Sequence, residues 1–127
     1  MRRDNGSGPG LNVYERIMVN LGIIKQKMHL RRAMKHVTDR TGRQSLQDHF
    51  ERVQRKGKHI RRLKTENRPD DPAVMKLVAG IQAAVDALEA EVVLLEHATD
   101  KPEQVKEVIA KGNAVIERVD GLIDFIA

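Results

Sequence analysis

Apolar residues recur at helical spacing along most of this chain, and start signals divide them into four predicted helices. The first helix is expected to run from Asn12, which suits an N-cap, to about Arg40, with Gly42 ending it. It carries two apolar stripes on different faces. The first stripe is Val13, Ile17, Leu21, Ile24 and Met28, and the second is Ile23, Leu30, Met34 and Val37. A helix with two apolar faces usually contacts two different neighbours. A break near Gly22 is the alternative.

The second predicted helix starts at a capping box, Ser45-Leu46-Gln47-Asp48, and extends to about Arg68. Its apolar positions fall within an arc of about 80°. They are Leu46, Phe50, Val53, Gly57 and Ile60. Gly57 lies inside this arc and indicates either a close helix crossing or a kink. The narrow arc predicts an outer helix whose opposite, basic face is exposed and available to a partner.

The last two helices have strong start signals. Asp71 followed by Pro72 combines a side-chain acceptor with proline at the first helical position, so the third helix should span about Pro72 to His97. Asp100-Lys101-Pro102-Glu103 repeats this logic for a fourth helix that runs to the C-terminus. The short gap between these helices predicts an antiparallel αα-hairpin.

The fourth helix has an apolar arc of about 140°, which is wider than one neighbouring helix covers. The residues of this face, which would be buried in the core or in an oligomer contact, are Val105, Ile109, Ile116, Val119, Ile123 and Ile126. They must be buried against the first two helices or against another subunit. We therefore predict an all-α, four-helix arrangement with two long basic helices and a C-terminal hairpin, and we expect it to be oligomeric.

Charge is divided sharply between the two halves of the chain. Residues 1–69 contain 18 Lys or Arg against 6 Asp or Glu, a net charge of +12, and residues 70–127 contain 5 against 12, a net charge of −7. This division indicates an electrostatic partner for one half or head-to-tail pairing of the two. We treat the chain as one domain with a flexible basic arm (1–11), a basic helical half (12–69) and an acidic hairpin (70–127).

The basic half supplies the candidate partner-binding or phosphate-binding residues. They are Arg31, Arg32, Lys35, Arg52, Arg55, Lys56, Lys58 and Arg62. Cations on one rigid helix face are typical of contacts with a nucleic-acid backbone. A solvated helix face without a ligand is the alternative. Aromatic residues make up 2% of the chain, which argues against recognition by base stacking.

Composition and motifs argue against most other chemistry. The chain contains no cysteine, so disulfides and zinc–thiolate sites are excluded. His29 and His36 share a helix face, but no third ligand accompanies them, and no metal or other cofactor is predicted. The carboxylate pairs Glu89/Glu91 and Glu103/Glu107 have no nucleophile or histidine beside them in sequence. We therefore expect neither an enzyme nor a small-molecule substrate.

The sequence contains no secretory signal and no run of about 18 apolar residues. Membrane-surface binding is not favoured, because the basic helix has a narrow apolar stripe and no tryptophan. We expect a soluble protein, cytoplasmic or within an intracellularly assembled particle. The favoured interpretation is a structural or assembly protein that oligomerises through its hairpin and contacts an acidic partner with its basic half. The alternative is a nucleic-acid-binding protein with weak sequence specificity.

Overall fold

The computed structural model describes residues 10–126, which form four helices and two very short strands. The helices are α1 (Val13–Met34), α2 (Arg40–Arg62), α3 (Pro72–His97) and α4 (Lys101–Ile126). The strands are β1 (Gly10–Leu11) and β2 (Lys64–Thr65). The predicted all-α class and the four helices are confirmed. Among the described residues, no helix has the combination of length and hydropathy that crossing a membrane requires.

A complete capping box starts α1. The Oδ1 atom of Asn12 accepts a hydrogen bond from the backbone N of Glu15 at 2.8 Å, and Glu15 Oε1 accepts one from the backbone N of Asn12 at 3.0 Å. Two amide donors at the helix end are thereby satisfied. The helix starts where the sequence predicted it.

The starts of α3 and α4 are confirmed in the same way. Asp71 accepts from the backbone N of Ala73 at 2.9 Å, with Pro72 at the first helical position. Asp100 accepts from the backbone N of Glu103 at 3.1 Å. Each acidic side chain satisfies an orphan amide and lies at the positive end of the helix dipole.

The boundary between α1 and α2 differs from the prediction. α1 ends at Met34, and α2 begins at Arg40, where the Asp39 carboxylate accepts from the backbone N of Gly42 at 2.8 Å. Gly42 therefore lies in the first turn of α2 and does not end α1. A Cβ atom at this position would come within 2.9 Å of Val37 Cγ1, so the tight start needs glycine. Ser45 lies inside the helix, and the predicted capping box there is wrong.

At Gly22 and Gly57 the sequence allowed either a break or kink in the helix or a close contact between helices, and the structure shows close contacts. α1 is continuous through Gly22, where an added Cβ atom would lie 3.2 Å from Ile81 Cγ2 of α3. α2 is continuous through Gly57, where it would lie 3.2 Å from Ile23 Cγ2 of α1. The missing side chains let α1 approach both of its neighbours closely, and neither glycine breaks or kinks its helix.

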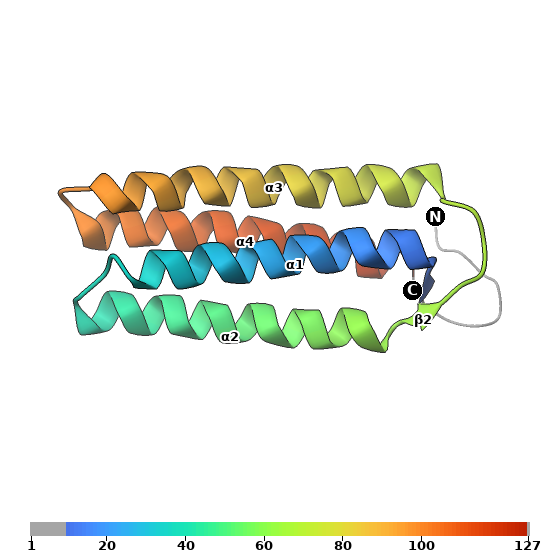
Figure 1. Ribbon diagram of the computed structural model, residues 1–127, viewed down its shortest axis with the longest axis horizontal. Coiled ribbons are helices and arrows are strands. Elements are labelled where there is room, and N and C mark those ends of the chain that lie inside the picture. The colour runs from blue at the N-terminus through green and yellow to red at the C-terminus, as the bar shows by residue number, and fades with distance from the viewer. Residues whose placement is uncertain (1–9, 127) are drawn as a thin grey trace.

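The helices form an elongated bundle in which α1 packs against α2 and α3, and α4 packs against α3 and α2 (Figure 1). α1 and α3 run in the same direction, and α2 and α4 run in the opposite one (Figure 1). The connection between α2 and α3 therefore crosses the end of the bundle, past the start of α1. This crossing places α1 at an outer corner, with one side toward the core and the other side turned away from it.

Backbone pairing and a buried ion pair fix the crossing segment. β1 and β2 form a parallel pair, with Gly10 opposite Lys64 and Leu11 opposite Thr65. The fully buried Glu15 carboxylate bonds both terminal nitrogens of Arg68, at 2.7 and 2.9 Å. The predicted flexible arm is therefore wrong at Gly10 and Leu11, since these residues belong to a strand and Leu11 is fully buried. The rest of that predicted arm lies outside the described residues.

The wide apolar face of α4 lies in the chain's own core. Its members are buried to 0–9% exposure except Ile109, which is half-buried at the core's edge: Val105, Ile109, Ile116, Val119, Ile123 and Ile126. α3 and α2 together cover the arc that one helix could not. Of the two predicted ways to bury this face, the structure uses the intramolecular one, so this face of the hairpin is not an exposed oligomerisation surface.

Candidate interaction surfaces

The eight predicted cationic residues do not gather into one surface. α1 and α2 pack so that Ile23 meets Gly57 and the Arg31 guanidinium lies 5.0 Å from the centre of the Phe50 ring. This pairing puts Arg31, Arg32 and Lys35 toward the end of the bundle where α1 leads into α2. It puts Arg55, Lys58 and Arg62 toward the opposite end.

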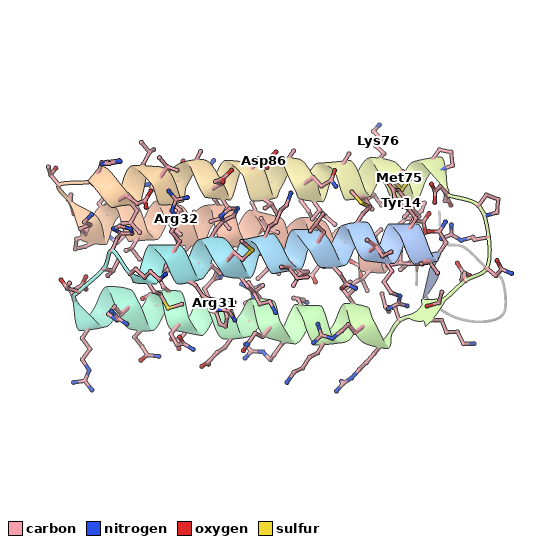
Figure 2. The ribbon with its side chains drawn as sticks, viewed as in Figure 1. Tyr14, Arg31, Arg32, Met75, Lys76 and Asp86 are labelled. Carbon is pink, nitrogen blue, oxygen red and sulfur yellow. The ribbon has the colours of Figure 1, made fainter. Side chains whose placement is uncertain are left out.

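Several of these cations hold the bundle together. Arg32 forms a two-point ion pair with Glu96 of α3, at 3.0 and 2.5 Å, and hydrogen bonding to this carboxylate raises the pKa of Arg32. Lys56 bonds Asp120 of α4 at 2.5 Å. Figure 2 shows Arg31 turned toward α2 and Arg32 turned toward α3. These residues link neighbouring helices, which makes them poor candidates for binding a separate partner.

Arg52 belongs to the same group, because its Nη1 atom donates to the Asn113 side chain of α4 at 2.7 Å. Of the eight predicted residues, four remain exposed and form no ion pair, side-chain hydrogen bond or ring contact within residues 10–126. They are Lys35, Arg55, Lys58 and Arg62. Arg61 is exposed beside them. We call Arg55, Lys58, Arg61 and Arg62 the α2 ridge.

The α2 ridge lies in a segment whose charged residues are all positive. From Arg52 to Lys64 the chain has seven Lys or Arg residues and no Asp or Glu. The ridge residues project from a single rigid helix, and nothing in this segment neutralises them. An anionic group that approaches this surface is attracted by several cations at once.

A second surface is the first apolar stripe of α1, which faces away from the core. Its members, together with Tyr14, are between 39% and 61% exposed: Val13, Tyr14, Ile17, Leu21, Ile24 and Met28. The second stripe is the one that packs, with Ile23 and Leu30 almost completely buried. We call the six exposed residues the α1 stripe. The two apolar stripes in the sequence of this helix indicated the exposed face, but the docking surface was predicted on the C-terminal hairpin.

A groove of about 250 Å³ runs beside the α1 stripe, between α1 and α3. Its lining residues are Leu21, Gly22, Lys25, Gln82, Val85 and Asp86. Gly22 lines the groove at the point where α1 approaches α3 closely. Lys25 lines it from α1 and Asp86 from α3, and Figure 2 shows Asp86 on α3. The volume of the groove is sufficient for an apolar side chain.

Polar side chains also meet inside the bundle. Gln26 Nε2 donates to the carbonyl oxygen of Gly112 at 3.1 Å and lies 3.4 Å from Nε2 of His49. Burial, aided by the positive charge of Arg52, lowers the pKa of His49 to about 4, so the ring is neutral at pH 7. These residues join α1, α2 and α4, and their burial indicates a role in positioning helices.

The histidines and carboxylates that the sequence analysis considered and did not favour as sites lie apart from any such cluster. His36 pairs with Glu96 at 3.0 Å, and burial is the main cause that lowers the pKa of His29. Glu91 accepts from Gln104, while Glu103 lies near Lys106 on the exposed side of α4. In residues 10–126, no three His, Cys, Asp or Glu side chains form a group suited to a metal ion.

Comparisons with protein-family models, with curated proteins and with solved structures found no match for this chain. The chemistry of the α1 stripe and of the α2 ridge is therefore the basis for interpreting their function.

Proposed function

We propose that this protein is a non-enzymatic assembly protein with two contact surfaces on one rigid bundle. The α1 stripe docks another protein, and the α2 ridge contacts an acidic partner. The observation that carries this proposal is the α1 stripe, in which six apolar residues of one helix stay 39–61% exposed while the apolar residues Ile23 and Leu30 of the same helix are buried. Contiguous exposed apolar surface of this kind is typical of protein–protein interaction sites.

The α2 ridge supports the second part of the proposal. Its cations have no acidic neighbours in sequence between Arg52 and Lys64, and they lie on a helix, which holds them in fixed relative positions. Acidic residues are concentrated on the C-terminal hairpin, where α3 has four Asp or Glu and one Lys. The ridge is therefore suited to an acidic surface on another molecule.

A binding titration tests the role of the ridge. The purified chain is titrated with polyglutamate at 50 and 200 mM salt, and binding should weaken as salt rises. The triple variant Arg55→Glu, Lys58→Glu and Arg62→Glu should abolish binding. The matched control is Lys76→Glu, Lys106→Glu and Arg118→Glu, which changes the net charge equally on exposed positions of α3 and α4. Equal losses in both variants would contradict a specific role for the ridge.

Nucleic-acid binding is the second candidate, because a helix with six Lys or Arg in the stretch from Arg52 to Arg62 also suits a phosphate backbone. The scarcity of aromatic residues favours contacts with phosphates over contacts with bases. The discriminating measurement replaces polyglutamate with duplex DNA. A logarithmic salt slope of about −0.9 per phosphate contacted, together with tighter binding to DNA than to polyglutamate, supports this candidate. The reverse order of affinities supports an acidic protein.

A further inference from the structure

The outward face of α1 has a pattern that reads the same in both directions. Four residues of the α1 stripe, Ile17, Leu21, Ile24 and Met28, follow one another at intervals of 4, 3 and 4 residues. These are the intervals of a helix–helix seam. Reversing the helix about a point between Gly22 and Ile23 places these four positions onto themselves. A twofold axis through that point makes the face complementary to a second copy of itself.

We infer that a second copy of this chain covers the α1 stripe, with the two α1 helices antiparallel. Ile17 then lies level with Met28 of the partner subunit, and Leu21 lies level with Ile24 of the partner subunit. This inference rests on the docking role proposed for the stripe and names its occupant. It is independent of whether the α2 ridge binds an acidic protein or a nucleic acid.

Charge selects the antiparallel direction. Arg16, in the first half of α1, is turned toward the end of α2, where it donates to the backbone carbonyls of Ile60 and Leu63. The other cations of α1 all lie in its second half: Lys25, Lys27, Arg31 and Arg32. In the antiparallel register they lie level with Asn20, Met18, Tyr14 and Val13 of the partner subunit, and none of these carries a charge. In a parallel pair each cation would face its own copy, and like charges across a helix interface are unfavourable.

The shape of the bundle permits this approach. α1 occupies a corner between α2 and α3, so its outward face meets a partner before the neighbouring helices do (Figure 1). The groove beside Gly22 lies at the level of the twofold axis, where Leu21 of the partner subunit enters it. Because one helix face buries less than the roughly 800 Å² per partner of a standard interface, we expect a weak dimer with a dissociation constant of about 1–100 µM.

Oligomeric state as a function of concentration is the first test. Light scattering after size exclusion, from about 1 µM to 1 mM around the expected midpoint, should show monomer converting to dimer. Leu21→Glu with Ile24→Glu should remain monomeric throughout. Val93→Glu with Leu94→Glu is the matched control, because it introduces the same charges at exposed apolar positions of α3, and it should dimerise like the parent chain.

Cysteine cross-linking tests the direction, since the natural chain has no cysteine. Mild oxidation of Ile17→Cys mixed with Met28→Cys should produce a disulfide-linked heterodimer. Each variant alone should stay uncross-linked, because positions 17 and 28 are about 16 Å apart along a helix and a disulfide needs Cα atoms within about 7 Å. Homodimers of the single variants, without the heterodimer, would indicate a parallel pair and overturn the inference.

A parent chain that stays monomeric at about 1 mM, well above the expected dissociation range, overturns the dimer, whatever other protein later proves to occupy the stripe. The dependence on salt concentration distinguishes failure of the dimer from failure of binding at the α2 ridge. Dimerisation should persist or tighten as salt rises, since the paired faces are both basic, whereas ridge binding should weaken. If the variant Leu21→Glu with Ile24→Glu still binds polyglutamate or DNA, binding by the α2 ridge does not depend on the dimer.

Discussion

The imidazole ring of His49 occupies the space that a side chain at position 112 would need. A Cβ atom added to Gly112 would come within 2.9 Å of both Cδ2 and Cε1 of His49, and closer still to Nε2. The ring is only 5% exposed, so it has little room to move away. Glycine at this point of α4 is a packing requirement set by a residue of α2.

Replacing Gly112 with alanine should therefore destabilise the bundle by about 1–3 kcal/mol, because the new methyl group overpacks the core. The midpoint of urea unfolding measures this loss. Gly121→Ala is the control on the same helix, since nothing lies within 4 Å of the added Cβ atom. That change should instead stabilise the protein by up to about 1 kcal/mol through helix propensity. Equal effects of the two substitutions would mean that His49 does not constrain position 112.

His49 should also make stability depend on pH. Its pKa is lowered in the folded chain to about 4, chiefly by burial and then by Arg52, from an ordinary value of 6.5. The unfolded chain therefore takes up a proton at a higher pH than the folded chain does. The free energy of unfolding should fall as pH drops from about 6.5 to about 4, by on the order of 3 kcal/mol from this group.

Urea unfolding between pH 8 and pH 4 measures this dependence, with His49→Leu as the comparison. The variant should lose most of the slope between pH 6.5 and 4 while matching the parent's flat response above pH 7. His29 also has a lowered pKa and contributes in the same direction, so a residual slope in the variant is expected. An unchanged slope would contradict the burial of a neutral His49 ring.

The Glu15–Arg68 pair should be a strong stabiliser of the crossing segment. Burial alone raises the pKa of Glu15, but hydrogen bonds from Arg68 and from the backbone amides of Asp71 and Asn12 hold it below its usual value. Arg68→Met leaves a buried carboxylate without its cation and should cost about 3–5 kcal/mol, read from urea unfolding at pH 7. Stability supplied by this carboxylate is present above pH 4.5 and is lost as pH falls through its folded pKa.

Two comparisons sharpen that test. Glu15→Met combined with Arg68→Met should cost less than Arg68→Met alone, because the double variant leaves no uncompensated buried charge. Lys106→Met removes the exposed partner of Glu103 and should change stability by less than about 1 kcal/mol. If the double variant is less stable than the single one, the hydrogen bonds that Glu15 accepts from the backbone amides of Asn12 and Asp71 outweigh the cost of burying its charge.

The start of α2 is open to a direct test as well. Asp39→Ala should destabilise the protein by about 1 kcal/mol, because it removes the acceptor for the Gly42 amide. Ser45→Ala should change stability by no more than about 0.5 kcal/mol, since Ser45 lies within the helix. Urea midpoints compare the two directly. A larger loss from Ser45→Ala would restore the start that the sequence alone predicted.

Local chemistry explains which features were predictable. Asn12, Asp71 and Asp100 each precede a helix and are followed by matching residues, and hydrogen bonds between near neighbours need no information from the rest of the chain. The predicted cap of α2 at Ser45 is wrong, because Asp39 caps the helix six residues earlier. The packing of Gly42 near Val37 favours the earlier start, and that contact forms only once the turn is closed.

The sequence by itself determined four helices, most of their starts, an aliphatic core and a basic first half opposed to an acidic second half. These features depend on periodicity, capping and composition, which are local properties. Only the tertiary structure decided which stripe of α1 is buried, because Ile17 and Ile23 have equal hydrophobicity and differ only in the helices that lie beside them. It also decided that Arg32 and Lys56 bind Glu96 and Asp120, while Arg55 and Lys58 stay exposed. These pairings join residues 64 positions apart, and they depend on parallel packing of α1 with α3 and of α2 with α4. The helix periodicity of the sequence does not encode that choice of neighbours.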